Sequence, residues 1–450
     1  MAYPSPIAQL HARAEAPMLP YGPAQPAGPA QPAEQAPVSG PSPAQVQIPA
    51  GYDEIELEYA SLRKHCVLLE GVHRGVLELT GPDRLDFLHR MLTQELRGSK
   101  DPASHALRPW RWVRSFWLNR KGRIDADLRV LALPDRVLLE ADVYAAARTE
   151  KTLGAYIITE DCALRDLTQS THRFSLHGPT AIALLLALRE ADQAASDAPD
   201  LASLAEGDVT RLRLAGHEVT VLRDDSAGEI GLELIVPAVG ARAVFELLLT
   251  AAHSPDEHQH GAPSSDDLAS RVRLRPAGWF AYNIARLEAG TPLYNIDFGP
   301  DSLPAETGLL HSRVSFTKGC YLGQEIVARM HARGHPKLTL VPIRMQRDEV
   351  VSNADPALKA AAEQALGEAE VPTILQPETG SAVFAVNADG TPGEAVGQVT
   401  SSTLAPMLGS APIALAMVKF QHAKPGPVLV SAESRLVPGE IRPELRFWSR

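Results

Sequence analysis

The stretch VLELTGPDRLDFLHRMLTQEL, Val76 to Leu96, changes from the pattern of a strand to that of a helix within a few residues. Val76 to Leu79 favours a strand, Thr80 is a candidate N-cap, and leucines at helical spacing from Leu85 onward would share one face. The stretch HGPTAIALLLALR, His177 to Arg189, repeats this order of strand, Gly-Pro and helix. Two similar subdomains, each an antiparallel sheet with packed helices, are therefore expected, and the fold class is α+β.

The sequence outside these repeats predicts a longer sheet and a third folded unit. WLNRKGRIDADLRVLAL and DRVLLEADV predict strands around turns at Gly122 and at Pro134-Asp135. After Lys337, the segments LTLVPIRM, SAVFAV, AVGQVTSS, IALAMVKF and GPVLVSA are short strands between Gly/Pro turns, which predicts a small C-terminal β-barrel. A chain of 450 residues suits two or three domains. We place the folded units at 54–170, 171–336 and 337–450.

Three stretches lack the pattern of a folded core. Residues 1–50 are dominated by Pro, Ala and Gln, and burial of apolar surface cannot offset the entropy of ordering them, so we expect a disordered tail without a catalytic role. Residues 253–267 read as a polar insertion within the second unit. We expect residues 352–375 to be an insertion in the third unit, within which residues 356–369 could form a surface helix.

Composition limits the environment in which the chain works. Three cysteines, Cys66, Cys162 and Cys320, are odd in number and far apart, which disfavours a disulfide framework or a zinc site and favours a reducing, cytoplasmic location. No apolar run is long enough for a membrane span, and the first residues lack the apolar core of a secretory signal. The net charge of -11 disfavours nonspecific binding to nucleic acid. No phosphate-binding glycine loop suggests a nucleotide site.

The segment FTKGCYLGQEIVARMH, Phe316 to His331, places Cys320 beside a lysine and near arginines and a histidine. Cationic neighbours favour the thiolate, which is the reactive form of cysteine. The alternative is a small, inert apolar residue at the start of a helix. Gly319 and Gly323 suggest a backbone with positive φ or a close contact, and Gln324 and Glu325 would follow in the first helical turn, where the dipole favours a carboxylate.

The run KGCYLGQE resembles the signature of the YgfZ branch of the glycine-cleavage T-protein family, which is folate-binding and aminomethyltransferase-like (GcvT-like). The resemblance continues in order through LTGPDRLDFLHRMLTQEL, LNRKGRIDADLRV, FSLHGPTAIALL, AGEIGLELIVP, ARLEAGTPLYNIDF, PAETGL and VGQVTSSTLAPMLGSAPIALAMV. It implies a cloverleaf of three units around a channel that holds tetrahydrofolate or another reduced folate. It also implies an accessory role with iron-sulfur client or assembly proteins, and an indirect link to tRNA modification. The alternative is a tetrahydrofolate-dependent aminomethyltransferase or methyltransferase.

The same resemblance assigns candidate site residues. Asp127 corresponds to the aspartate that orients the reacting groups near the folate N10, with Asp125 as a competitor. Glu233 corresponds to the glutamate that reads the pterin edge, since a carboxylate accepts hydrogen bonds from neighbouring N–H donors. Arg286 corresponds to an arginine at the folate site. The resemblance makes Cys320 a candidate for redox chemistry, cluster or persulfide contact, or partner exchange. The remaining signature positions counted with the folate site are Lys318, Gly319, Tyr321, Gly323, Gln324 and Glu325. Each of the charged side chains could instead face solvent.

Two further patterns permit more than one interpretation. RPWRWVRSFWLNRKGR, Arg108 to Arg123, alternates tryptophans with basic residues, as would a wall that stacks single-stranded RNA or a pterin. An amphipathic hairpin with a solvated face is the favoured interpretation. His253, His258 and His260 lie in the polar insertion without accompanying carboxylate or cysteine ligands, so a solvated loop is favoured and no metal is expected.

Overall fold

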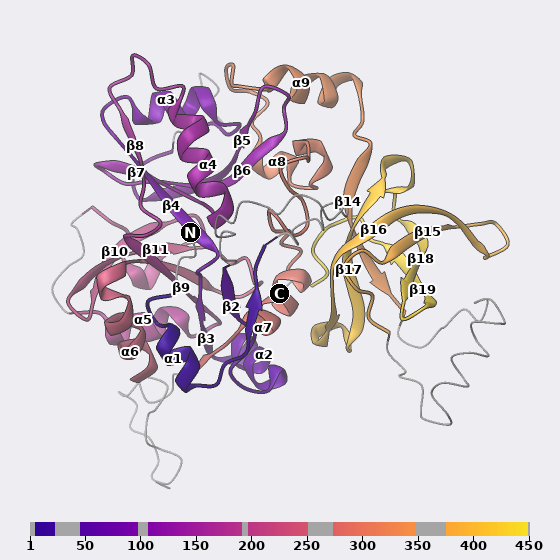
Figure 1. Ribbon diagram of the computed structural model, residues 1–450, viewed down its shortest axis with the longest axis horizontal. Helices are drawn as coiled ribbons and strands as arrows, with labels where there is room; N and C mark the ends of the chain where they lie inside the picture. Colours follow the sequence, from indigo (N-terminus) through magenta and orange to yellow (C-terminus); the bar gives the residue numbers. More distant parts are fainter. Residues whose placement is uncertain are drawn as a thin grey trace, which may run out of the picture.

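The computed structural model describes residues 5–22, 46–97, 107–190, 197–250, 273–346 and 375–448. Figure 1 shows three lobes: a purple sheet unit, a second unit in magenta beside it, and a yellow barrel on the other side. This is the expected α+β class, with two units of sheet and helix and a C-terminal barrel. The histidine tract and both predicted insertions lie largely or wholly outside the described residues.

The first sheet is five-stranded and antiparallel, in the order β5-β6-β7-β4-β8. Its strands are β5 (Arg111–Leu118), β6 (Ile124–Ala132), β7 (Arg136–Asp142), β4 (Arg74–Thr80) and β8 (Ala163–Asp166), and its helices are α3 (Arg84–Met91) and α4 (Val143–Gly154). The turns at Gly122 and at Pro134-Asp135 connect β5, β6 and β7 as predicted. Leucine, valine and aromatic side chains from one face of the sheet and from both helices form the first core.

The second sheet has six strands in the order β10-β11-β12-β9-β3-β13, and only the β3–β13 pair is parallel. The strands are β10 (Val209–Leu214), β11 (His217–Arg223), β12 (Gly231–Pro237), β9 (Thr171–His177), β3 (Cys66–Glu70) and β13 (Leu274–Pro276). Helices α2 (Ile55–Lys64), α5 (Ala181–Leu188), α6 (Ala241–Thr250) and α7 (Trp279–Glu288) accompany it. The first unit was expected to span residues 54–170. This assignment is wrong for β3, which falls in that range but pairs within the second sheet.

A closed barrel of six strands, β14-β17-β16-β15-β18-β19, forms the third lobe. Its strands are β14 (Leu338–Met345), β15 (Ala382–Val386), β16 (Pro392–Ala405), β17 (Ala411–Lys419), β18 (Gly426–Ala432) and β19 (Arg435–Ile441). Five of the six were predicted from short apolar runs. Because β14 pairs with both β17 and β19, the sheet closes and leaves no free edge.

The repeated Gly-Pro turns confirm the internal similarity that the opening stretch suggested. Gly81 has φ +100°, and an added Cβ would lie 2.2 Å from the Asp161 carbonyl oxygen. Gly178 has φ +136°, and an added Cβ would lie 2.3 Å from the His65 carbonyl oxygen. Only glycine fits both positions. The helix after the first turn begins at Arg84 with Asp83 as its N-cap, so Thr80 as the N-cap is wrong.

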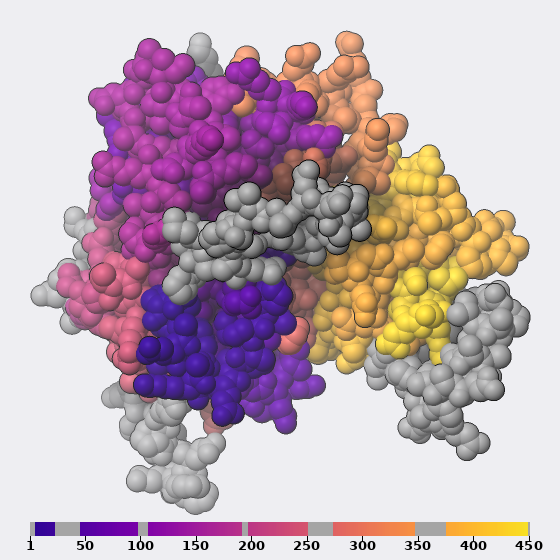
Figure 2. Space-filling view, in the orientation of Figure 1, coloured from indigo at the N-terminus to yellow at the C-terminus, as the bar shows by residue number. Residues whose placement is uncertain are grey.

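The N-terminal tail was expected to be disordered throughout, and this is wrong for the part that the structure describes. Residues 8–13 form α1 (Ala8–Arg13), and β1 (Met18–Pro20) pairs with β2 (Gln47–Pro49). Ile7 is fully buried in the second core, and the Tyr21 hydroxyl donates to Asp142 at 2.6 Å. Figure 2 shows this indigo segment lying against the magenta and purple units. A few apolar residues anchor a segment whose average composition argued against order. The Pro/Ala repeat that dominated this average lies almost entirely outside the described residues.

The tryptophan run forms part of the core rather than a stacking wall. Trp110, Trp112 and Trp117 are 4%, 8% and 1% exposed. Trp110 and Trp112 pack between the two sheets, and the Trp112 indole nitrogen donates to the Arg223 carbonyl at 2.9 Å. The hairpin is confirmed, because β5 pairs with β6, but the solvated face expected for it is wrong, since cores cover both faces of the two strands. The alternative of rings available for RNA or pterin stacking is wrong, because Trp110 and Trp112 are buried between the sheets and Trp117 is buried in the first core.

Candidate functional site

A cavity lies where the two sheets meet α7 and the N-terminal segment. Its internal volume is about 50 Å³, and it is partly open to solvent. Glu233 of β12 lines it together with Arg114, Arg129 and Arg74 from the first sheet. The other lining residues are Ile48, Pro49, Leu69, Glu70, Gly71, His73, Ser175, Ser226, Ala277, Gly278, Trp279, Tyr282, Thr291 and Leu293. Charged groups and aromatic residues therefore line one partly open cavity.

Glu233 is one of three buried carboxylates held by arginines at this junction. Its two oxygens lie 3.5 Å from Arg129 Nη2 and 3.5 Å from Arg173 Nη2. Arg129 and Arg173 also bind Glu140, at 2.9 Å and 2.7 Å. Glu233 is 8% exposed and Glu140 is fully buried. The contacts of Glu233 are longer than those of Glu140. The arginines therefore hold the oxygens of Glu233 less tightly than those of Glu140.

The cluster continues toward the first sheet. Arg74 Nε lies 2.6 Å from Glu140, and Asp224 forms ion pairs with both Arg129 and Arg114. Sheet register explains part of this arrangement, since Arg129 of β6 lies directly opposite Glu140 of β7. The rest requires the second sheet to approach the first, because Arg173 and Glu233 come from β9 and β12.

The arginines lower the pKa of two of these carboxylates, Glu140 and Asp224. Burial alone would raise the pKa of Glu140, but Arg129, then Arg173 and Arg74, hold that pKa well below its usual range. The pKa of Asp224 is also lowered, because Arg114 and Arg129 outweigh its burial. The site is thus a preorganised set of full charges in a region of low dielectric, where each interaction is stronger than in water.

Asp127 lies on β6, on the same face as Arg129 but outside the residues that line the cavity. Its Oδ1 accepts a hydrogen bond from Arg313 Nε at 3.1 Å, and both side chains are about nine-tenths buried. Arg313 comes from α8 (Leu310–Arg313) and contributes to the lowered pKa of Asp224. Asp127 is therefore oriented by an arginine that also acts on the cavity cluster. The competitor, Asp125, accepts instead from the Asn119 side chain at 3.2 Å.

Arg286 occupies a different place, between α7 and the barrel. It is fully buried and forms an ion pair with Asp297 at 2.7 Å. Its guanidinium also donates to the Ser401 hydroxyl at 2.8 Å, the Asn283 side chain and the Thr291 carbonyl. It borders a second, polar cavity with Trp279 and Thr400, not the cavity lined by Glu233. In this structure Arg286 fastens the barrel to α7.

The signature segment lies on the outer side of the first unit, and none of its residues lines the Glu233 cavity. Lys318 is buried, and its Nζ donates to the carbonyls of His89, Leu92 and Gln94, where α3 ends. Burial lowers the pKa of Lys318 to about 8. Tyr321 is 7% exposed and packs in the first core. These two signature residues attach the segment to the first unit.

Gly323 confirms the predicted conformation before a helix. It has φ +79° and precedes α9 (Gln324–Arg333), and an added Cβ would lie 2.8 Å from the Asn119 carbonyl oxygen. The same expectation is wrong for Gly319, which is exposed, has no positive φ and has nothing within 4 Å of an added Cβ. Gln324 is partly buried and Glu325 is exposed in the first turn of α9.

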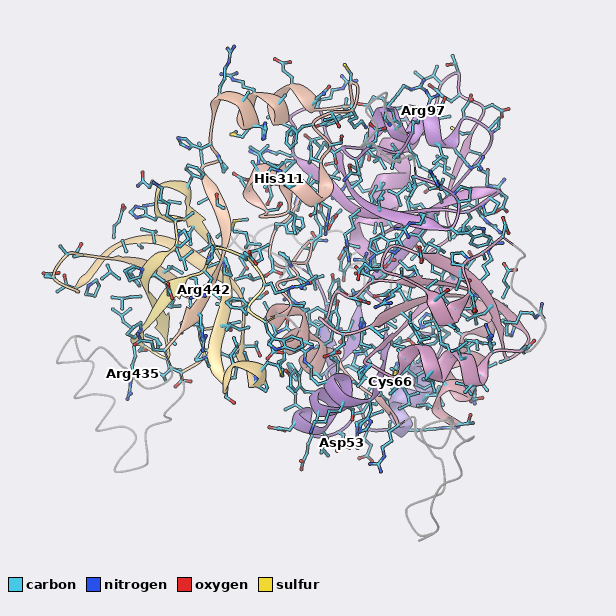
Figure 3. All side chains as sticks on the ribbon, turned by 180° about the vertical axis from the view of Figure 1, so that it is seen from behind. Asp53, Cys66, Arg97, His311, Arg435 and Arg442 are labelled. Atoms are coloured by element: carbon cyan, nitrogen blue, oxygen red, sulfur yellow. The ribbon has the colours of Figure 1, made fainter. Side chains whose placement is uncertain are left out.

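Cys320 is exposed, whereas Cys66 is buried and Cys162 is partly buried. Burial raises the pKa of the Cys66 thiol far above its usual value. In Figure 3 the labelled His311, on α8 just before the signature segment, lies in a different part of the molecule from the labelled Cys66 on β3. Among the described cysteines, Cys320 is the one that a large partner can reach.

Residues 42–318 match the family model described as the GCVT N-terminal domain. The chain belongs to this family. It is 28% identical over 386 residues to an aminomethyltransferase of Cutibacterium acnes, covering 84% of this chain and 86% of that protein. It is 25% identical over 391 residues to a mitochondrial aminomethyltransferase of Dictyostelium discoideum, covering 85% of this chain and 81% of that protein.

A solved structure shows the same fold. The glycine cleavage system aminomethyltransferase T from Bartonella henselae superposes with a TM-score of 0.70 at 20% identity, covering 100% of this chain and 98% of that chain. Within the described residues, no helix is both long enough and apolar enough to cross a membrane. The family relationship therefore rests on sequence and the shared architecture on structure.

Sequence reasoning missed most of the cavity wall. Arg129 had a usable signal, because it is a lone arginine in the apolar strand run LRVLAL and lies two residues after Asp127, on the same face. Arg74, His73 and Trp279 had none, since each is an ordinary residue until the two sheets meet.

Proposed function

We propose that this protein binds tetrahydrofolate or another reduced folate in the cavity lined by Glu233. The observation that carries the proposal is a carboxylate, 8% exposed, that lines the cavity together with aromatic residues. An ionised carboxylate accepts two hydrogen bonds side by side, and a pterin edge offers an N–H and an amino group in that spacing. The relatives named aminomethyltransferase support this ligand class.

The rest of the wall fits such a ligand. Trp279 and Tyr282 line the cavity with aromatic rings suited to packing on a planar ring, and Leu69 and Leu293 add apolar surface. Arg129 Nε is shielded from solvent and lacks a hydrogen-bond partner within the described residues. Buried donors are rarely left unpaired in native proteins, so a bound acceptor would satisfy it. Arg114 adds positive charge for the carboxylates of a folate.

We propose further that the folate-bound protein supports the assembly or repair of iron-sulfur clusters in client enzymes, in a reducing, cytoplasmic compartment. The signature that carries Cys320 motivates this role, and the exposure of the thiol supports it. The thiol lies outside the Glu233 cavity, which suits contact with a protein partner rather than with the folate itself. An effect on tRNA modification would arise indirectly, through the client enzymes.

A tetrahydrofolate-dependent aminomethyltransferase is the second candidate, favoured by the names of the relatives and by the orientation of Asp127. In that reaction the Asp127 carboxylate, held by Arg313, would orient the folate amine while a one-carbon unit is transferred. The bound folate would supply the acceptor nitrogens. Asp127 and Cys320 therefore separate the two candidates.

The test of the folate site is calorimetric titration with tetrahydrofolate and with 5-formyltetrahydrofolate. Glu233→Ala should weaken binding by about tenfold or more, because hydrogen bonds to a charged group contribute about 1.5–3 kcal/mol. Glu325→Ala is the matched control, since that carboxylate is exposed on α9. If the alanine variant loses stability, Glu233→Gln replaces it in the titration, because glutamine keeps the shape of the side chain without its charge. Unchanged affinity in a folded Glu233 variant would remove the assignment.

A second experiment separates the candidate roles. In cells that depend on the protein, Cys320→Ser should abolish complementation while leaving folate affinity intact if the accessory role holds. If the protein is a transferase, Asp127→Ala should remove turnover and Cys320→Ser should be mild. A silent Cys320→Ser variant in cells would end the thiol hypothesis.

A further inference from the structure

His73 is a cavity residue to which the proposed folate site has so far given no role. It lies between β3 and β4, and its backbone carbonyl accepts a hydrogen bond from Val143 N at 2.9 Å. Its ring centroid lies 5.0 Å from that of Tyr21 and 5.9 Å from that of Trp279. Two aromatic rings thus hold the imidazole at the wall of the cavity.

The Nδ1 atom of His73 is shielded from solvent and has no hydrogen-bond partner within the described residues. A buried polar atom without a partner costs about 1–3 kcal/mol, and such atoms in native structures call for an explanation. Because His73 lines a cavity that can hold a ligand, a polar atom of that ligand is the simplest missing partner.

The surroundings keep the imidazole neutral. Burial, followed by the nearby Arg74, lowers the pKa of His73 to about 3, and Arg129 and Arg173 act in the same direction. Glu140 opposes them without reversing the effect. A neutral imidazole has one donor and one acceptor nitrogen, and it can bind an uncharged polar edge without adding to the positive charge of the cluster.

We propose that His73 contacts the bound folate directly, through a hydrogen bond between its Nδ1 and a polar atom of the planar ring system. This inference rests on the proposed folate site and adds a second polar contact to that of Glu233. It also gives the N-terminal segment a part in binding, because Tyr21 packs against the imidazole and Ile48 and Pro49 line the same cavity.

The test compares His73→Phe, which keeps a ring but removes the nitrogens, with His73→Asn, whose amide can take the place of Nδ1. Titration with 5-formyltetrahydrofolate should show a loss of about five- to tenfold for the phenylalanine variant, as expected for one hydrogen bond. The asparagine variant should recover part of this loss. His217→Phe is the control, because His217 begins β11, packs against Gly240 and does not line the cavity.

Nuclear magnetic resonance of ¹⁵N-histidine in the unmodified protein supplies a readout that does not depend on a variant. The Nδ1 signal of His73 should shift when 5-formyltetrahydrofolate binds, and the signals of His217 should not. Unchanged affinity of a folded His73→Phe variant, or a static Nδ1 signal, would overturn the inference while a weakened Glu233→Ala variant leaves the folate site standing. Absence of any folate binding would overturn both.

Discussion

The Glu233 cavity and the KGCYLGQE segment differ in almost every physical respect. The cavity is assembled from residues far apart in the chain, holds charges in buried ion pairs, and is lined in part by Ile48 and Pro49 of the N-terminal segment. The KGCYLGQE segment is contiguous, attaches through Lys318 and Tyr321, and exposes Cys320. A local signature is therefore easy to find in a sequence, whereas the group of residues able to enclose a ligand is visible only in the fold.

The largest expected difference between the two regions is in how far the free energy of unfolding depends on their charged side chains. Arg129→Met leaves Glu140, Asp224 and Glu233 with less compensation and should lower the free energy of unfolding by about 3–5 kcal/mol. Urea unfolding followed by circular dichroism measures this. Arg120→Met, an exposed arginine beside the KGCYLGQE segment, should leave the urea midpoint unchanged. Equal effects in the two variants would contradict the view of the cluster as a buried network.

Acid should weaken the cavity region selectively. Burial alone would raise the pKa of Glu70, but hydrogen bonds with His11 and His172 outweigh it and hold that pKa at about 2. A carboxyl with a depressed folded-state pKa stabilises the protein above its unfolded value of about 4.5 and loses this contribution as the pH falls toward 2.

Glu70→Gln should therefore cost about 3 kcal/mol at neutral pH, since each pKa unit corresponds to about 1.4 kcal/mol. The difference in the free energy of unfolding between this variant and the unmodified protein should disappear as the pH falls from 4.5 to 2. Denaturant titrations at several pH values measure it, with Glu325→Gln as the exposed control. If this difference in the free energy of unfolding did not change with pH, Glu70 would stabilise the protein through packing and not through its charge.

Within the KGCYLGQE segment, Lys318 should matter more for stability than Cys320. Lys318→Met removes the donor to three carbonyls at the end of α3 and should cost about 1–3 kcal/mol in thermal or urea unfolding. Lys121→Met, on the neighbouring exposed turn, is the control. If the two variants unfold alike, the attachment of the segment does not depend on this lysine.

The smallest effect on stability is expected at Cys320, and the effect there is on chemistry. A thiol reagent should label Cys320 rapidly in the native protein, and Cys66 only after unfolding, because access and thiolate character govern the rate. Cys320→Ser should remove the rapid phase without shifting the unfolding midpoint. Rapid labelling that persists in this variant would assign the phase to Cys162.

Local patterns predicted the fold well, and the site only in part. The two Gly-Pro turns and the short strands of the barrel are properties of neighbouring residues, so the sequence shows them directly. Glu233 lines the cavity, and Asp127 was placed on the right strand. Arg286 was grouped with the folate site, but in the structure it binds Asp297 and Ser401, because the barrel packs against α7.

The N-terminal segment shows why averaged composition misleads. Its Pro and Ala content argued for disorder, yet Ile7, Tyr21 and Ile48 each find a buried position that the rest of the chain creates. The crossing of β3 into the second sheet was equally hidden. A strand pattern says that a segment will pair, but it does not say with which partner.

The sequence by itself determined where most strands, turns and helices form, because these depend on interactions between residues close along the chain. The tertiary structure alone decided which charges meet, since Arg129, Glu140, Arg173 and Glu233 come from four strands of two sheets. It also placed Cys320 on the surface and His73 at the cavity wall. Burial and long-range electrostatics arise only after the sheets have packed, and they give ordinary side chains the chemistry of a site.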